Sequence, residues 1–161
     1  MKRLRFQNGP LDAVDAAILR ALATDARMTM SDLARAVGLS PPSVTERVRR
    51  LEEAGVIRGY RIEVDPAALG LPLAAYIRVR PIPGHLHKVA EVLLGLGAIV
   101  ECDRVTGEDC FIAKAHVASV AELEALIDEI VPYAMTNTSI IQSSPVKRRL
   151  LPLVTTVAAA V

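Results

Sequence analysis

The feature that most constrains the fold is a pair of helix boundaries separated only by the residues "GLS". Gly38 ends an apolar helical pattern, because glycine is favoured just past the last turn of a helix. Ser40 is a suitable N-cap for the next helix, and Pro41 and Pro42 fall in its first turn, where proline costs little. Two short helices joined by such a glycine-containing turn are typical of a helix-turn-helix.

The helical pattern begins before this turn. A first helix is predicted over residues 12–24, with Asp12 as its N-cap and Asp15 in the first turn, where a carboxylate complements the helix dipole. A second helix is predicted to start at Ser31. Apolar residues recur at helical spacing along both helices, namely Val14, Ile18, Leu22, Leu33, Ala34 and Val37.

The helix that begins after Ser40 divides clearly into faces. Val44, Val48 and Leu51 are spaced for burial on one side. At about 100° per residue, a contiguous stripe lies beside or opposite that side. It consists of Ser43, Glu46, Arg47 and Arg50, with Arg49 on the far side of the helix. We therefore expect the arginines to point away from the core.

Beyond Gly55, which ends this helix, the stretch "VIRGYRIEVD" alternates between apolar and polar residues like a strand, with a turn at Gly59. Arg58 and Arg61 lie on this expected wing. The following "DPAALGLP", residues 65–72, contains proline and glycine and is the natural domain boundary.

The second half of the chain has the order βαββαβ. The predicted strands and helices occupy residues 73–81, 85–97, 98–105, 110–117, 119–131 and 136–144. Ser119 and Glu122 form a capping box, and the inward residues of that helix are expected to be Val120, Leu123, Ile127 and Ile130. The sequence thus predicts an α+β fold, with an N-terminal winged helix-turn-helix joined to a C-terminal ferredoxin-like sandwich.

The expected limits are 1–62 for the helical domain, 63–73 for a hinge or linker, 74–150 for the sandwich and 151–161 for an apolar tail. The last segment, "LLPLVTTVAAAV", is too short to span a bilayer. It is predicted to be a strand or tail that packs on a neighbour, or a frayed end.

Charge is distributed unevenly along the chain. Residues 1–61 contain 11 Lys and Arg against 7 Asp and Glu, a balance of +4, whereas residues 62–161 contain 8 against 11, a balance of −3. Only the N-terminal part is therefore expected to meet a polyanion, although such a surplus is also compatible with ordinary surface scatter.

The absence of a membrane span or signal peptide favours the cytoplasm. Cys102 and Cys110 are interpreted as ordinary thiols.

Double-stranded DNA is the polyanion that suits a helix-turn-helix. Lys and Arg neutralise phosphates, and arginine donates two hydrogen bonds to guanine in the major groove. Ser40 and the helix N-terminus are placed to hold a phosphate, while Arg49, Arg58 and Arg61 would be further backbone contacts. The alternative is a solvated basic face that never touches DNA. The candidate DNA-binding residues are Ser40, Pro42, Ser43, Thr45, Arg47, Arg49, Arg50 and Arg58.

Three stretches resemble the Lrp/AsnC (feast/famine) family of transcriptional regulators: "LDAVDAAILRAL", "LARAVGLSPPSVTERVRRLEEAGVI" with the following "GY", and "VTGEDCF". The resemblance extends from Leu11 to Leu150. It implies a winged helix-turn-helix, a hinge strand, and a ligand-sensing domain through which the chain forms homodimers. Family members commonly assemble further into octamers and typically respond to amino acids, so the implied partners are DNA, a small amino-acid effector and further copies of the chain.

The resemblance also implies an effector site between subunits, formed by a turn of the sensing domain and the start of its last strand. Gly107 would let backbone donors approach a carboxylate, and Glu108 or Asp109 would accept from an ammonium group. Cys110 stands where Asp is frequent, which leaves the effector's identity open. The alternative is an ordinary hairpin turn. The candidates are Thr106, Gly107, Glu108, Asp109, Cys110, Thr136, Asn137, Thr138 and Ser139.

Two other classes of function stay open. Some proteins of this architecture resemble the regulators but act as decarboxylases of siroheme-type tetrapyrroles, an activity that would use His85, His87 or His116 and arginines of the second domain. The other class is a metabolite-binding module that acts only through other proteins. The sequence shows no catalytic set, metal-ligand set or phosphate loop, so we predict a protein that is not an enzyme and needs no cofactor or metal.

Overall fold

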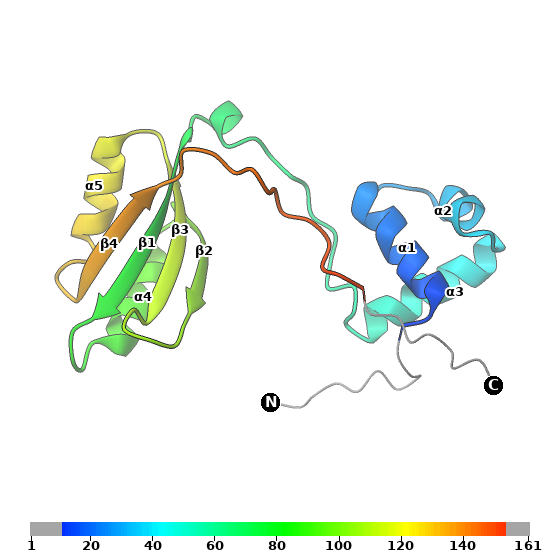
Figure 1. Ribbon diagram of the computed structural model, residues 1–161, viewed down its shortest axis with the longest axis horizontal. Helices are drawn as coiled ribbons and strands as arrows, with labels where there is room; N and C mark the ends of the chain where they lie inside the picture. The colour runs from blue at the N-terminus through cyan, green and yellow to red at the C-terminus, as the bar shows by residue number, and fades with distance from the viewer. Residues whose placement is uncertain (1–10, 154–161) are drawn as a thin grey trace. The chain divides into compact units, whose positions relative to one another are not determined.

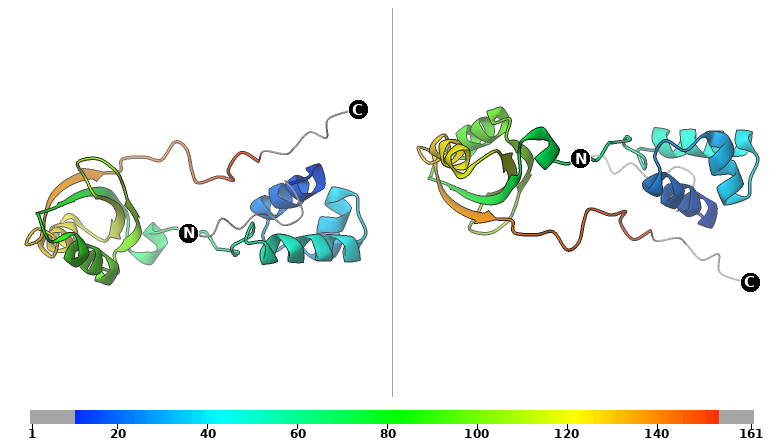
Figure 2. Two further views of the ribbon diagram at one scale, coloured as in Figure 1. Left: turned by 90° about the horizontal axis from the view of Figure 1, so that it is seen from below. Right: turned by 90° about the horizontal axis from the view of Figure 1, so that it is seen from above.

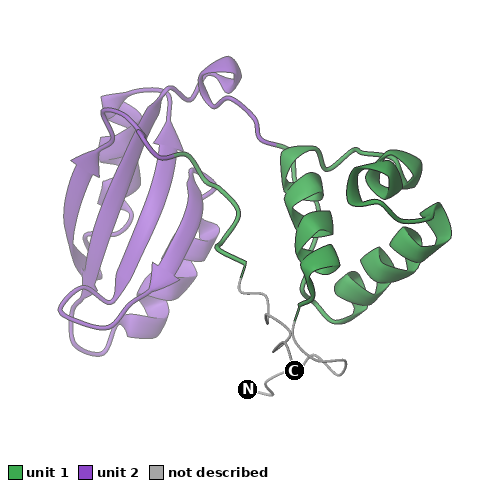
Figure 3. Cartoon of the chain, turned by 45° about the vertical axis from the view of Figure 1, so that its right-hand side comes forward, with its two compact units in different colours: residues 1–62, 147–161 green, residues 63–146 purple. Residues whose placement is uncertain are grey.

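The computed structural model describes residues 11–153 and divides the chain into two compact units (Figures 1 and 3). The helical unit comprises Met1–Ile62 together with Lys147–Val161, of which residues 11–62 and 147–153 are described. The sheet unit comprises Glu63–Val146. Each helix within residues 11–153 is too short or too polar to cross a bilayer.

Three helices form the helical unit: α1 (Ala13–Thr24), α2 (Met30–Val37) and α3 (Pro41–Glu53). Asp12 caps α1 as predicted, since its carboxylate accepts from the backbone N–H of Asp15 at 2.7 Å. Gly38 adopts a left-handed conformation, with φ of 72°, in the turn between α2 and α3. The predicted helix-turn-helix is confirmed. One buried cluster joins the three helices: Ile18, Leu19, Leu22, Leu33, Ala34, Val44, Val48 and Leu51.

Helix α2 begins earlier than predicted. Its N-cap is Thr29 rather than Ser31, and the Thr29 hydroxyl accepts from the backbone N–H of Asp32 at 3.1 Å. The same hydroxyl donates to the Asp32 carboxylate at 2.7 Å. Ser31 therefore lies within the first turn, because Thr29 and Asp32 already satisfy the cap.

The strand predicted for the segment after α3 does not form. Residues 58–65 lie outside helices and strands. The backbone N–H groups of Val56 and Ile57 instead bond to the carbonyl of Leu51, and the Tyr60 hydroxyl donates to the Glu52 carboxylate at 2.8 Å. An isolated two-stranded ribbon is marginally stable at best, so alternating polarity in two short arms did not suffice to form one.

The sheet unit follows the predicted order. After the short helix η1 (Ala67–Leu69), its elements are β1 (Leu73–Pro81), α4 (Leu86–Gly95), β2 (Ile99–Arg104), β3 (Phe111–Val117), α5 (Val120–Asp128) and β4 (Ala134–Ile140). The four strands are antiparallel in the order β2-β3-β1-β4. Helices α4 and α5 cover the same face of the sheet, and one core cluster joins them to β1 and β3 (Figure 2). The ferredoxin-like sandwich is confirmed.

Two details of this unit differ from the prediction. Helix α5 ends at Asp128, and β4 spans Ala134–Ile140 rather than residues 136–144. Val120, expected to face inward, is 53% exposed, whereas Leu126 is buried beside Leu123. Val120 is the first residue of α5, directly after the N-cap Ser119, and the buried residues of the helix begin at Leu123.

The last described residues of the chain lie with the helices. Residues 147–153 group with the helical unit, whereas the predicted sandwich extends to residue 150. Leu153 packs against the helical core cluster, and Leu150 lines a pocket with Leu19 and Leu22. Leu150 and Leu153 thus contact the helical unit, whereas Leu151 is 79% exposed. Residues 154–161, which include most of the predicted tail, lie outside the described range.

Candidate nucleic-acid interface and effector site

The N-terminus of α3 is closed by its own side chains. Ser40 Oγ accepts from the Ser43 backbone N–H at 3.4 Å and lies 2.8 Å from the Ser43 hydroxyl. Pro41 and Pro42, in the first turn, have no N–H group to donate. The helix N-terminus therefore lacks the free backbone donors that the sequence prediction assumed. The groups that it presents to solvent are the hydroxyls of Ser40 and Ser43.

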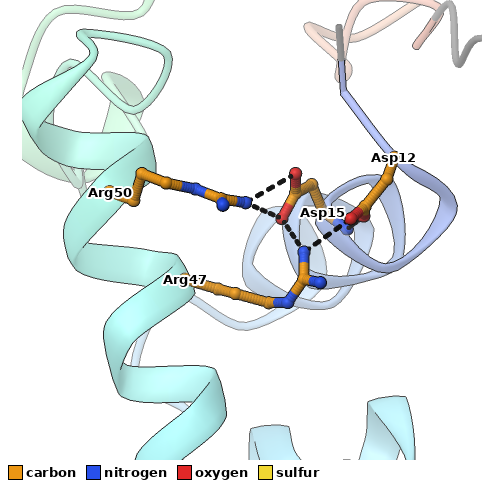
Figure 4. A network of polar contacts seen from close by, with 4 residues as sticks. All are labelled: Asp12, Asp15, Arg47 and Arg50. Carbon is orange, nitrogen blue, oxygen red and sulfur yellow. Dashed lines mark hydrogen bonds and ion pairs between the residues drawn. The ribbon is translucent and has the colours of Figure 1, made fainter. Parts of the chain in front are cut away.

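Two arginines of α3 bind carboxylates of α1 (Figure 4). Arg47 Nη1 donates to Asp15 Oδ1 and to Asp12 Oδ2, each at 2.7 Å. Arg50 Nη2 lies 3.2 Å from Asp15 Oδ2 and 3.3 Å from Asp15 Oδ1. The Asp15 side chain is only 2% exposed. A buried carboxylate is stable only when it is paired and hydrogen-bonded, so Asp15 ties α3 to one position on α1.

This network changes the proton affinity of its members. Hydrogen bonds to Asp12 and then to Asp15 raise the pKa of Arg47 above its ordinary value. Burial alone would raise the pKa of Asp12, but hydrogen bonds from the Asp15 backbone and from the Arg47 guanidinium outweigh burial and lower it. Both shifts favour the charged forms, which keep the two helices in contact.

The expected outward orientation of Arg47 and Arg50 is wrong. Their side chains are 27% and 33% exposed and point toward α1 rather than away from the core (Figure 4). The Nε atom of Arg50 is buried and has no hydrogen-bond partner among the described residues. Helical spacing placed both residues beside the apolar face, but it did not reveal that α1 supplies carboxylates there. Both arginines therefore join α3 to α1.

Arg49 is the arginine on the solvent side of α3. Its side chain is 55% exposed, and its guanidinium binds the carboxylates of Glu46 and Glu53. These hydrogen bonds raise the pKa of Arg49, and the bond from Arg49 lowers the pKa of Glu46. Pro42 and Thr45 are exposed on the same side. The exposed face of α3 consists of Pro42, Thr45, Glu46 and Arg49.

The segment after α3 carries two exposed cations. Arg58 and Arg61 form no ion pair with another residue in the range 11–153. Between them, Tyr60 is fastened to α3 by its hydrogen bond to Glu52. Burial, followed by this hydrogen bond, raises the pKa of Tyr60 to about 12. The segment is therefore attached to α3 through a neutral phenol, and its two guanidinium groups remain exposed.

The predicted effector turn, residues 106–110, is hydrogen-bonded to the end of β1. The Val105 N–H donates to the Cys110 carbonyl at 2.9 Å, and the Cys110 N–H donates to the Val79 carbonyl at 3.1 Å. Gly107 has φ of 116°, a conformation that favours glycine. Thr106 and Gly107 are exposed. The turn therefore has a defined shape whose tip faces solvent.

An arginine of the same chain faces this turn. Arg80 Nη2, at the end of β1, lies 2.6 Å from Glu108 Oε2 and 3.7 Å from Asp109 Oδ1. The two carboxylates assigned to an ammonium group thus already have a cationic partner. A charged effector that contacts Glu108 or Asp109 must compete with Arg80 or bind beside it.

The other predicted effector residues lie on β4, across β1 from the turn. Thr136 pairs with Val79, and Asn137 pairs with Arg78. Asn137 and Ser139 are exposed, whereas Thr136 and Thr138 are half-buried, as strand alternation requires. Cys110 and Thr136 both neighbour Val79, so the turn and the β4 candidates lie on opposite sides of one strand, β1.

The histidines proposed for an enzyme occupy separate places. His85 stacks on Tyr133 with ring centroids 5.9 Å apart, and Lys88 lies over the same ring. His87 is exposed on α4, and His116 lies on β3 opposite Ala74. The stacking of His85 on Tyr133 gives this histidine a structural role.

Some of these contacts had no usable signal in the sequence. Asp15 was assigned only to the helix dipole, and Arg80 was not singled out, because their partners are distant along the chain. The pairing of Arg49 had a signal: Glu46 and Glu53 are three residues before it and four after it, the spacings at which helical side chains meet.

Two family models match the chain. Residues 11–58 match a winged helix-turn-helix DNA-binding model, and residues 74–151 match the Lrp/AsnC ligand binding domain. The first range contains α1 to α3 with the Asp15 network, and the second contains the whole sheet with the predicted effector residues.

Several known proteins are similar over most of their length. The HTH-type transcriptional regulator LrpC of Bacillus subtilis is 38% identical over 133 residues, which cover 83% of this chain and 92% of LrpC. LrpA of Mycobacterium tuberculosis, another HTH-type transcriptional regulator, is 36% identical over 132 residues, covering 81% of this chain and 88% of LrpA.

Solved structures of similar proteins match the fold of this chain. The structure of Bacillus subtilis LrpC has a TM-score of 0.83 at 36% identity and covers 87% of this chain and 100% of that chain. A transcriptional regulator from Neisseria meningitidis, solved as a complex with L-Met, has a TM-score of 0.81 at 25% identity and covers 88% of this chain and 97% of that chain. The relatives named here are regulators, which does not favour the decarboxylase alternative.

Proposed function

Since the chain belongs to the Lrp/AsnC family of transcriptional regulators, we propose that it binds double-stranded DNA sequence-specifically and that a small amino acid alters this binding. The observation that supports this most directly is the attachment of α3 to α1 through Asp15. A recognition helix must be held at a fixed angle to place its side chains in the major groove. The ion pairs of Asp15 with Arg47 and Arg50 would hold α3 at such an angle and leave its exposed face free.

We assign the contacts to DNA accordingly. Arg49 would donate to guanine and Glu46 would accept from cytosine, while Pro42 and Thr45 would contact neighbouring base edges. The exposed hydroxyls of Ser40 and Ser43 and the guanidinium of Arg58 would bind phosphates. Arg47 and Arg50 would act on DNA binding mainly by holding α3 in position.

The proposal is tested by fluorescence anisotropy with a duplex from the gene's own upstream region and a scrambled duplex, at two salt concentrations. We expect tighter binding to the native duplex and a steep loss of affinity with salt. Equal, weak binding to both duplexes would contradict sequence-specific recognition of this region, and a second search with genomic fragments would then decide whether any site is preferred.

A matched pair of variants tests the role of the exposed face. Arg49→Ala should reduce the preference for the native duplex by roughly 10-fold, because one base contact is lost. Arg35→Ala is the control, since Arg35 is also an exposed arginine in an ion pair, with Asp32 at 3.0 Å. The control should leave the ratio between the duplexes unchanged. An equal loss of preference in both variants would contradict the assignment.

We further propose that a small amino acid binds where two subunits meet. Thr106–Cys110 and Thr136–Ser139 lie on either side of β1 in one chain, so a second subunit packed against them would enclose a ligand between such groups. The relative solved with L-Met suggests the chemical class. Thermal unfolding with a panel of amino acids tests this. Stabilisation by one of them, reduced by Asn137→Ala and by Glu108→Ala, is expected.

The same proposal requires an oligomer, and we propose a homodimer that assembles further to an octamer. The sheet face that α4 and α5 leave uncovered exposes Tyr76 and Met135, which suits a contact between copies of the sheet unit. Sedimentation velocity over a range of concentrations checks this. A monomer at all concentrations would contradict both the oligomer and the effector site shared between subunits.

A further inference from the structure

The basic run Lys147–Arg149 belongs to the helical unit, although it follows the last strand of the sheet unit. The next residue, Leu150, lines a pocket of about 310 Å³ whose other walls include Leu19 and Leu22 of α1 and residues 56–61. Leu153 packs against the core cluster of the same unit. Leu150 is 42% exposed and Leu153 is partly buried, and these two apolar contacts place the end of the basic run beside the helices.

The same pocket places the end of the basic run beside two cations of the segment that follows α3. Arg58 and Arg61 line it together with Leu150, which directly follows the run. All five cations, Arg58, Arg61, Lys147, Arg148 and Arg149, are exposed, and within residues 11–153 none has a carboxylate partner. We call them the C-terminal basic surface.

The arginines of α3 provide the contrast. Each of the three is paired with at least one carboxylate, so a phosphate that binds Arg47, Arg49 or Arg50 must compete with Asp or Glu. A phosphate that binds the C-terminal basic surface displaces only water and small counterions. Counterion release is the main source of non-specific affinity for DNA, so unpaired cations contribute more than paired ones.

We propose that the C-terminal basic surface binds phosphates of the DNA backbone that flank the bases contacted by α3. The inference rests on the proposed DNA-binding function. Duplex DNA is the partner that fits, because Arg58 follows shortly after the end of α3 at Glu53 and Tyr60 is bonded to Glu52 in the last turn of that helix. Leu150 acts as a positioning residue, because it anchors the run beside Arg58 and Arg61.

The test compares two double variants of the full-length protein. Arg148→Gln with Arg149→Gln removes two charges from the C-terminal basic surface, whereas Lys88→Gln with Arg104→Gln removes two charges from the sheet unit. Anisotropy titrations at several salt concentrations give the slope of log K against log [salt]. Each phosphate contact contributes about 0.9 to this slope, so the first variant should lower it by up to about 1.8 per chain and the second should leave it unchanged.

Two further measurements locate the contact. Trimming the flanks of the duplex should weaken wild-type binding but abolish the difference between the wild type and the Arg148/Arg149 variant. Leu150→Ser keeps every charge and should still weaken binding to the long duplex several-fold, because the run is no longer held beside Arg58. Circular dichroism melts of each variant show whether the helices are intact.

The outcomes separate the two proposals. If the wild type binds no duplex, the proposed function fails. If the wild type binds DNA but the Arg148/Arg149 variant keeps the wild-type slope, or if the Lys88/Arg104 control loses as much, the C-terminal basic surface is not a DNA contact. If the slope falls but trimming the flanks does not remove the difference, the run binds phosphates elsewhere and the flanking placement is overturned.

Discussion

The guanidinium of Arg47 on α3 lies 2.7 Å from the carboxylate of Asp15 on α1, and that carboxylate is almost fully buried. Arg50 approaches the same carboxylate from the next turn of α3. One acidic side chain thus determines where two of the three arginines of α3 point. Changes at Asp15 should therefore affect stability first and DNA binding through it.

Replacing Asp15 with Ala should lower the free energy of unfolding of the helical unit by about 1.5–3 kcal/mol, because the charged hydrogen bonds between α1 and α3 are lost while Arg47 keeps Asp12 and both guanidinium groups stay partly exposed. Urea denaturation followed by circular dichroism measures the loss. Asp32→Ala is the matched control, because it breaks an exposed ion pair with Arg35, and its effect should be much smaller. Similar losses for both variants would contradict the structural role of Asp15.

The arginines of α3 should separate stability from DNA recognition. Arg47→Ala is expected to lower the unfolding midpoint, since it leaves Asp15 paired only with the more distant Arg50. Arg49→Ala should leave the midpoint nearly unchanged and reduce the preference for the native duplex. Thermal melts and anisotropy on the same samples check both effects. If Arg49→Ala lowered the unfolding midpoint and Arg47→Ala reduced only the preference for the native duplex, the outward orientation predicted for Arg47 would be supported instead.

Acid should weaken the contact between α1 and α3. The folded pKa of Asp12 is lowered below its ordinary value, so its ionised form stabilises the fold at higher pH. That contribution is complete above the unfolded pKa, about 3.9, and is lost as the pH falls through the lower folded value. Urea midpoints measured from about pH 5 downward should converge for the wild type and Asp12→Asn. A constant difference across this range would exclude Asp12 as the titrating group.

The cap of α3 should make a modest contribution. Ser40→Ala removes the acceptor for the Ser43 N–H and should cost about 0.5–1 kcal/mol, at the lower end for N-caps because the bond is long at 3.4 Å. Ser40→Asp keeps an acceptor and should restore the stability. It should not restore DNA affinity if the Ser40 hydroxyl donates to a phosphate, because a carboxylate repels one. Anisotropy on Ser40→Asp distinguishes the two roles.

Arg80 should control the order of the effector turn. Arg80→Gln removes the cation that holds Glu108 at 2.6 Å, so hydrogen exchange at residues 106–110 should become faster while β1 stays protected. Arg78→Gln, on the same exposed side of β1, is the control and should leave that turn unchanged. Faster exchange in both variants would show that the strand, not the ion pair, was disturbed.

Local sequence signals predicted most of the fold. Caps at Asp12, Ser40 and Ser119, the left-handed Gly38, and the helical and alternating periods fixed the order of elements, because each depends on neighbouring residues. The strand expected around Gly59 failed because a strand needs a pairing partner, which polarity alone does not supply.

The site was predicted less completely because its contacts join distant residues. Periodicity gives the side of α3 on which Arg47 lies, but Asp15 decides whether that side faces solvent or another helix. For the same reason, the sequence identified the effector turn without Arg80. Leu150 was assigned to the sandwich because nothing local indicates that its partners are Leu19 and Leu22.

The helical unit is discontinuous in sequence, since residues 63–146 separate its two parts. If residues 63–146 were flexible, docking the second part of the unit on the first would cost the loop-closure entropy of that whole segment. The pairing of β1 with β4 shortens the loop: Ala75 lies opposite Ile140, and the Ile141 N–H donates to the Ala74 carbonyl at 2.8 Å. Once the sheet has formed, only residues 63–73 and 142–146 remain to be closed. The stability of the unit assigned to DNA therefore depends on a strand pair that contributes no atom to it.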